Sequence, residues 1–328
     1  MRALATYLLR GNKEAIIVVL VCSVLALLIP VFGLFNAVIV GLVSLRQGAN
    51  KGLMLAGISS AVVAVGISMF GVLPEANEGQ GFAAIGQWVV SLFGLVALCG
   101  ILRYTRSLQL TMLSAVGAAV AVVVGFRLFV RDTVSWWQNS QFETIKELYG
   151  NAVESVLAQP AVVNHQMLES VSAYLVGIVV ATFTAGLIIH LFLSRSWQAA
   201  MFNPGGFRDE FIQLRFSKQV AIVPILSLIV FMMAGAENFV GYSCLAVTMI
   251  FAMVYTIFGF AVIFGVFKAK NWHWGIVIGA LVAFLVVGTL QFRSPEYPAV
   301  MLILVFAFIG FIDTFLDFRK KAQSKPAE

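Results

Sequence analysis

Charged residues are scarce in this chain of 328 residues, and their scarcity decides the class of protein. Asp, Glu, Lys and Arg make up only 11% of the sequence, whereas hydrophobic residues make up 61% and the mean hydropathy is +0.97. A soluble fold of this length cannot hide so much apolar surface. The composition therefore predicts an integral membrane protein and excludes an ordinary soluble domain.

Cysteines and catalytic motifs are also sparse. The three cysteines, Cys22, Cys99 and Cys244, form no CxxC pair and lie in apolar runs, so we interpret them as packing residues. The chain has no HExxH and no Walker A sequence, and GYSC around Ser243 does not complete GxSxG. We therefore predict no enzyme, with no catalytic residue, no metal site and no cofactor.

Long apolar runs are what the sequence has in abundance. They are continuous rather than alternating, which indicates membrane-spanning helices and not a barrel. We expect an all-α polytopic transmembrane bundle of about ten spans, near residues 15–29, 31–45, 52–73, 87–102, 107–126, 171–193, 220–236, 240–267, 275–292 and 298–317.

The first two spans form one apolar stretch that is broken only by Pro30 and Gly33. This stretch is either a hairpin of two short helices or one long tilted helix. With a hairpin and a cytoplasmic N-terminus, 17 of the 21 Lys and Arg residues face the cytoplasm, and the exceptions are Arg127, Arg131, Lys146 and Arg293. The positive-inside rule favours this arrangement. It predicts ten spans in a single membrane domain, residues 1–328, with both termini cytoplasmic.

The net charge of +6 follows from the same distribution. Basic residues at the cytoplasmic ends of spans lie beside anionic lipid headgroups. We therefore expect membrane lipids as partners and no nucleic acid.

Two segments outside the membrane interrupt the chain. Residues 127–170 carry apolar side chains at helical spacing, which predicts an extracytoplasmic amphipathic helix that acts as a lid or as a seal of the bundle. Residues 194–219 form a cytoplasmic loop and helix. In this loop the sequence Asn203-Pro204-Gly205-Gly206 predicts a type II turn.

A short in-plane helix is expected after this turn. One of its faces is expected to carry Phe207, Phe211, Leu214 and Lys218, and another Arg208 and Arg215. Either the turn and the two arginines dock an acidic partner or a lipid phosphate, or the arginines extend to headgroups as in any interfacial loop.

Polar groups within the predicted spans are few. The candidates are Asn36, His190, Glu237 and Asp313. His190 and Asp313 could relay protons or bind a cation together; otherwise His190 is simply hydrogen-bonded, and Asp313 belongs to an ion-paired helix end with Asp317 and the following basic residues.

Small residues recur every four positions in three predicted spans. Such faces let helices approach closely, either within the bundle or against a partner subunit. They are Ala56, Ser60, Ala64 and Ser68; Gly117, Ala121 and Gly125; and Gly275, Gly279 and Ala283.

Two stretches resemble a known family. RSWQAAMFNPGGFRDEFIQLRFSK and PVFGLFNAVIVGLVSLRQGANKGLMLAG look like the bacterial YybS-like predicted membrane proteins, a domain of unknown function. That family is distantly similar to the substrate-binding subunits of energy-coupling-factor transporters. The resemblance implies a bacterial cytoplasmic (inner) membrane protein, with an ATPase and a membrane coupling subunit as possible partners. Those subunits usually have fewer helices than the ten expected here.

Two function classes follow from these observations. The first is a membrane-embedded substrate-binding or permease subunit for a small solute, coupled to a separate partner, which requires a polar pocket. The alternative is a non-transporting membrane scaffold or lipid-handling protein, whose cavity would be apolar or absent.

Overall fold

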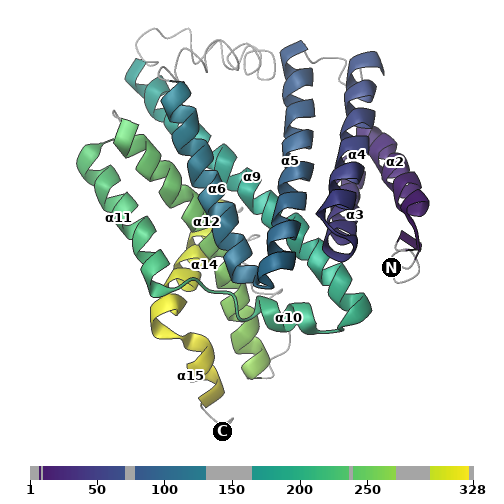
Figure 1. Ribbon diagram of the computed structural model, residues 1–328. Helices are drawn as coiled ribbons and strands as arrows, with labels where there is room; N and C mark the ends of the chain where they lie inside the picture. Colours follow the sequence, from purple (N-terminus) through teal and green to yellow (C-terminus); the bar gives the residue numbers. More distant parts are fainter. Residues whose placement is uncertain are drawn as a thin grey trace. The chain divides into compact units, whose positions relative to one another are not determined.

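The computed structural model describes residues 7–8, 10–70, 78–130, 165–235, 239–270 and 296–324. Every regular element among them is a helix, so the predicted all-α class is confirmed (Figure 1). In chain order the helices are α2 (Asn12–Leu28), α3 (Val31–Gln47), α4 (Ala49–Phe70), α5 (Glu78–Thr105), α6 (Leu108–Phe129), α9 (His165–Phe202), α10 (Gly206–Phe211), α11 (Lys218–Ala234), α12 (Phe239–Ala269), α14 (Glu296–Leu316) and α15 (Phe318–Ser324).

Five helices are long and apolar enough to cross a membrane. They are Ala49–Met69, Gly81–Thr105, Leu108–Phe129, Val176–Phe202 and Phe239–Ala269. Val31–Gln47, Lys218–Ala234 and Met301–Leu316 are shorter apolar helices. The expectation of a membrane protein is thus supported. The span predicted at 275–292 and most of the predicted outer helix at 127–170 lie outside the described residues.

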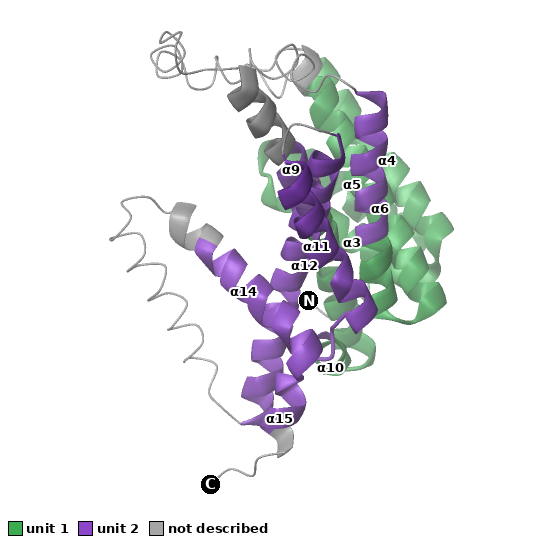
Figure 2. Ribbon diagram, turned by 90° about the vertical axis from the view of Figure 1, so that its left-hand side faces the viewer, with its two compact units in different colours: residues 1–115, 183–210 green, residues 116–182, 211–328 purple. Residues whose placement is uncertain are grey.

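The chain forms two compact units where the sequence suggests a single domain (Figure 2). Unit 1 comprises Met1–Ala115 and Phe183–Glu210, and unit 2 comprises Val116–Thr182 and Phe211–Glu328. The boundaries fall inside α6, α9 and α10.

Unit 1 is built around α3. Residues 36–45 of this helix are all buried, as expected for a helix that is apolar on every side. Small residues at the contacts allow neighbouring helices to approach α3 closely. A Cβ on Gly41 would lie 2.9 Å from Ser194 Cβ in α9, and a Cβ on Gly52 in α4 would lie 2.9 Å from Ser44 Cβ. Cys99 in α5 lies 3.7 Å from the Gly41 carbonyl oxygen.

The stretch 15–45 consists of two helices, as charge distribution favoured. α2 ends at Leu28, Pro30 occupies the N-cap of α3, and the Gly33 amide donates to the Pro30 carbonyl over 2.9 Å. Proline lacks the amide needed to continue α2, but it is tolerated where a helix begins. The chain reverses direction at this break, as the hydrogen bond from Asn36 in α3 to Ser23 in α2 shows.

Unit 2 is built on the pair α12 and α14. Thr256 in α12 donates to the Ile303 carbonyl of α14 over 3.1 Å, and a Cβ on Gly259 would lie 2.9 Å from Phe306 Cα. Near the C-terminal end of α12, Arg319 Cδ, just after α14, lies 3.0 Å from where a Cβ on Gly265 would be, so α12 and α14 run in the same general direction. Phe216, ahead of α11, packs edge-to-face on Phe258 of α12 with 4.8 Å between ring centroids.

In each unit the basic residues gather at one end of the helices. In unit 1 these are Arg10, Lys13, Arg46, Lys51, Arg103, Arg106, Arg195 and Arg208, and in unit 2 they are Arg215, Lys218, Lys268, Lys270, Arg319, Lys320 and Lys321. Arg127 of unit 2 is an exception; it lies over the Tyr242 ring, near the start of α12, with 4.6 Å to its centroid. Segregation of this kind is what the positive-inside pattern requires.

Candidate functional site

Asn36 lies in a buried polar network between four helices of unit 1. Its Nδ2 donates to Ser23 Oγ of α2 over 2.9 Å and to Ser59 Oγ of α4 over 2.7 Å. Ser59 Oγ also accepts from Trp88 Nε1 of α5 over 3.1 Å. Asn36, Ser23 and Ser59 are fully buried. The network therefore joins α2, α3, α4 and α5 through uncharged groups.

Every proton of this network can be assigned to an acceptor. Ser59 Oγ already accepts from Asn36 and Trp88, so its hydroxyl donates to Ser23 Oγ over 2.9 Å, and Ser23 donates to the Val19 carbonyl over 2.7 Å. The Asn36 Oδ1 oxygen is left buried without a partner among the described residues. A reversed amide would instead leave two N–H donors unpaired, which favours the observed orientation.

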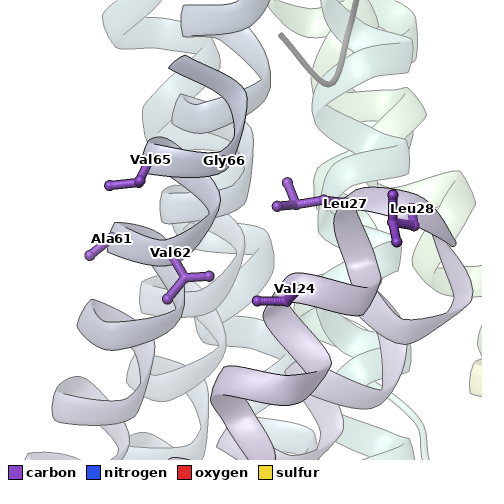
Figure 3. A pocket seen from close by; sticks show the side chains of 7 residues that line it. All are labelled: Val24, Leu27, Leu28, Ala61, Val62, Val65 and Gly66. Atoms are coloured by element: carbon purple, nitrogen blue, oxygen red, sulfur yellow. The ribbon is translucent and has the colours of Figure 1, made fainter. Parts of the chain in front are cut away.

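An apolar groove opens between α2 and α4 of unit 1. Its volume is about 500 Å³, and its lining contains no charged side chain: Val24, Leu27, Leu28, Ala61, Val62, Val65 and Gly66. Figure 3 shows Val24 and Leu27 pointing across the gap toward α4, and Val62 pointing toward α2. Leu27 follows Ser23 by one helical turn, and Val62 follows Ser59 in the same way, so the groove lies next to the network along both helices.

The predicted turn is present. The Gly206 amide donates to the Asn203 carbonyl over 3.0 Å, and Gly205 has φ +91°, the value that a type II turn requires at its third residue. Asn203, Pro204 and Gly205 are exposed, and a Cβ on Gly206 would collide with the Asn203 amide.

The helix that follows the turn is shorter than predicted. α10 ends at Phe211, and Leu214 and Phe216 are buried in a non-helical segment before Ser217 caps α11. Leu214 and Phe216 are two positions apart, so in a continuous helix they would lie on different faces and could not both be buried in unit 2. Their burial therefore explains why the helix ends early. Arg208 lies exposed on α10, whereas Arg215 lies beyond it, so the two do not share a helical face.

Each end of this segment is held by an arginine. In unit 1, Arg195 of α9 makes a bidentate ion pair with Glu210, including a 3.0 Å bond from Nε to Oε2, and also donates to Gln198. In unit 2, Arg319 of α15 donates to the carbonyls of Ile212 (2.5 Å) and Leu214 (3.2 Å).

Asp313 belongs to the same cluster in unit 2. Its Oδ2 accepts from Arg319 over 2.5 Å and its Oδ1 from the Phe318 amide over 2.8 Å, and the residue is 1% exposed. Nearby, Arg215 pairs with Asp317 over 3.1 Å and Lys320 approaches the same carboxylate at 3.4 Å. The expectation of an ion-paired helix end is confirmed for both aspartates.

The remaining intramembrane candidates contribute less. His190, in α9, hydrogen-bonds to the backbone of Gly186 one turn earlier. Glu237 lies outside the described residues. Over the part of the chain that the structure describes, no group of three His, Cys, Asp or Glu side chains could hold a metal ion.

The small-residue faces differ from one another. Ala56 and Ser60 of α4 are buried, whereas Ser68 of α4 and Gly117 and Ala121 of α6 are exposed, so of the two faces that the structure describes only the first half of the α4 face is packed. The third face, at residues 275–283, lies outside the described residues.

Sequence reasoning missed three members of the buried network. Asn36 stands out as an amide in an apolar run, but Ser23, Ser59 and Trp88 are residue types common in membrane helices. Their spacing along the chain carries no signal, because it is the packing of four helices that brings them together. The groove was missed for the same reason.

Comparisons with protein-family models, curated proteins and solved structures find no match to this chain. The resemblance to YybS-like proteins therefore stays a prediction, and function has to be argued from the residues of the two units.

Proposed function

We propose that this chain is a lipid-handling membrane protein that binds a lipid acyl chain in the groove between α2 and α4. The observation that carries this proposal is the apolar lining of the groove, which has a volume of about 500 Å³. Ligand pockets in proteins commonly have volumes of about 300 to 1,000 Å³. A solute-binding subunit requires convergent polar groups in its pocket, and this lining supplies none.

The surroundings of the groove favour the same occupant. α4 is long and apolar enough to span a membrane, so the groove faces hydrocarbon rather than water. Val24, Leu28 and Val65 at its rim are at least half exposed. An apolar cavity does not hold water stably, and acyl chains are the molecules available at this depth.

Bound lipid can be measured after purification in mild detergent, by native mass spectrometry. Val24→Trp fills the groove and should remove a retained lipid or reduce its occupancy several-fold. Val90→Trp on α5 is the matched control, because Val24 is 52% exposed and Val90 56% exposed but Val90 does not line the groove. Equal lipid retention by both variants would refute the proposal.

The topology that we propose keeps the ten predicted spans, with the basic ends and both termini in the cytoplasm of a bacterial cell. The parallel direction of α12 and α14 supports it, because one further crossing between them returns the chain to the starting side. Cysteines placed at Lys270 and Glu296 of a cysteine-free variant should be labelled from opposite sides of the inner membrane. Labelling from the same side would contradict ten spans.

A solute-binding or permease subunit is the second candidate. The unpaired Asn36 Oδ1 favours it, since a buried acceptor can receive a hydrogen bond from a polar ligand. The exposed turn at Asn203, Pro204 and Gly205, with Arg208, would then contact a partner ATPase and coupling subunit.

Co-purification separates the two candidates. Arg208→Glu is the better probe of docking, because Arg215 already pairs with Asp317 and its reversal would disturb unit 2. Recovery of an ATPase with the wild type and its loss in Arg208→Glu would favour the transporter component. Recovery of lipid alone from both proteins would favour lipid handling.

A further inference from the structure

Two chain reversals meet at the basic end of unit 1. The α3–α4 connection turns at Gly48, whose φ is +109°, and the α5–α6 connection turns at Arg106, whose φ is +52°. They are adjacent, because Arg103 Nη1 lies 3.1 Å from where a Cβ on Gly48 would be. Ala49 Cβ lies 3.9 Å from the corresponding position on Gly100. The two connections therefore form one continuous surface.

This surface carries four cationic side chains, which we call the loop patch: Arg46, Lys51, Arg103 and Arg106. The three arginines are exposed and Lys51 is half-buried. Within the described residues none of the four pairs with a carboxylate. The Arg46 guanidinium lies 3.6 Å from the centroid of the Phe202 ring, which restrains it. The patch is thus a region of positive charge without internal compensation.

The backbone adds to the positive potential of the loop patch. α4 begins at Ala49 and α6 begins at Leu108, so the amino-terminal ends of both helices lie at this surface. Helix N-termini favour anions, and here they reinforce four side chains of the same sign.

The position of the loop patch along the helices indicates which anion it meets. Three helices that are long and apolar enough to span a membrane end or begin here, at Ala49, Thr105 and Leu108. The patch therefore lies at the boundary of the hydrocarbon, the depth of lipid phosphates. Arginine guanidinium groups bind phosphate oxygens in a bidentate manner, which a diffuse attraction to a charged surface does not require.

We propose that the loop patch binds the phosphate of an anionic membrane lipid. This inference goes beyond the proposed function and concerns a separate site. Lys51 and Ala61, the nearest lining residue of the groove on α4, are 10 residues apart, which corresponds to about 15 Å along a helix, so the patch and the groove are separate surfaces. A failure at one site leaves the other untouched.

The test is a titration of the purified full chain in neutral detergent, with the unfolding temperature as the readout. Phosphatidylglycerol is the probe, and phosphatidylcholine and inorganic phosphate are parallel arms. The test variant is Arg103→Gln/Arg106→Gln. The matched control is Arg10→Gln/Lys13→Gln, which removes two exposed cations from the same end of unit 1 without altering the patch.

We expect phosphatidylglycerol to stabilise the wild type and the control alike, with an apparent Kd about tenfold weaker for the test variant. An equal weakening in the control would overturn the proposal, because only diffuse charge would then be involved. Equal stabilisation by phosphatidylcholine, or saturation by inorganic phosphate with no further effect of the lipid, would overturn it as well.

Two further variants keep the outcome interpretable. If Arg103→Gln/Arg106→Gln does not fold in detergent, Lys51→Gln/Arg106→Gln can replace it. This variant also removes two positive charges, but it keeps Arg103, the side chain that contacts Gly48. Arg103→Lys retains the charge but not the bidentate geometry, and it should recover only part of the lipid response. A complete absence of a phosphatidylglycerol effect on the wild type would refute the site.

Discussion

Units 1 and 2 bury polar groups in different ways. Unit 1 holds uncharged groups, Asn36, Ser23 and Ser59, in the middle of its helices. Unit 2 holds the charged pair Asp313 and Arg319 where α14 ends and α15 begins. Hydrocarbon tolerates hydroxyl and amide groups that bond one another, whereas charges at depth cost far more. Among the described residues the buried charged side chains are Arg127, Asp313 and Arg319, and each lies within about one turn of a helix end, where backbone groups also need partners.

Removal of Asp313 should have the largest effect. Asp313→Ala leaves the Arg319 guanidinium, whose side chain is 11% exposed, without its carboxylate, and we expect about 3 to 5 kcal/mol of destabilisation. The loss is measurable as a lower midpoint of unfolding in detergent. Asp313→Asn is the control, since it keeps the acceptor for the Phe318 amide and should cost less. A change below about 1 kcal/mol would show that the pair is hydrated.

Close helix contacts provide a second comparison. A Cβ on Gly310 of α14 would collide with the Tyr255 carbonyl and lie 2.6 Å from the Gly259 amide nitrogen, so backbone would have to move. In unit 1, a Cβ on Gly41 would meet the Ser194 side chain. We expect Gly310→Ala to cost up to about 3 kcal/mol and Gly41→Ala less. Equal unfolding midpoints for the two variants would contradict this order.

The buried network of unit 1 should respond more weakly than the charged pair of unit 2. Asn36→Ala removes the two hydrogen bonds that Asn36 Nδ2 donates, but Ser23 and Ser59 retain the bond between them, so we expect about 1 kcal/mol of destabilisation. The Trp88 indole bonds to Ser59, and its fluorescence should therefore report a local change. If Asn36→Ala lowered the free energy of unfolding as much as Asp313→Ala does, the proposed difference between uncharged and charged buried groups would be wrong.

Much of the helical arrangement could be predicted from the sequence, because apolar runs and helix breakers are local signals. Pro30 and the Pro204-Gly205 pair mark real breaks, and the turn at Gly205 has the expected backbone angle. The end of α10 could not be predicted in the same way. Phe207, Phe211 and Leu214 fit a helical pattern, but the burial of Leu214 and Phe216 in unit 2 ends the helix at Phe211.

The sites were harder to predict than the helices. Asn36 and Asp313 were identified as unusual residues in apolar runs, yet their partners come from other helices or from the backbone of a distant loop. Ser59 is 23 residues from Asn36, and Ile212 is 107 residues from Arg319. Pairing over such separations is set by helix packing, which one sequence does not reveal.

The smallest predicted effect concerns the ion pair between Arg215 and Asp317, which is more exposed than the pair between Arg319 and Asp313. Burial raises the pKa of Asp317, but hydrogen bonds and charge from Arg215 and Lys320 outweigh it and hold this pKa below its ordinary value of 3.8. A depressed carboxylate pKa contributes stability that is fully present above the unfolded-state pKa and is lost as the pH falls through the folded-state pKa.

Asp317→Asn isolates this contribution from the backbone. Asp317 has φ +52°, and asparagine tolerates that conformation about as well as aspartate, so the variant removes the charge without new strain. Because the Arg215 side chain is 44% exposed, we expect a difference of at most about 1 kcal/mol between wild type and variant. The difference should be constant from pH 5 to pH 7 and shrink below about pH 4. Unfolding midpoints measured across this range check the prediction, and a difference that grows on acidification would reverse the sign of the argument.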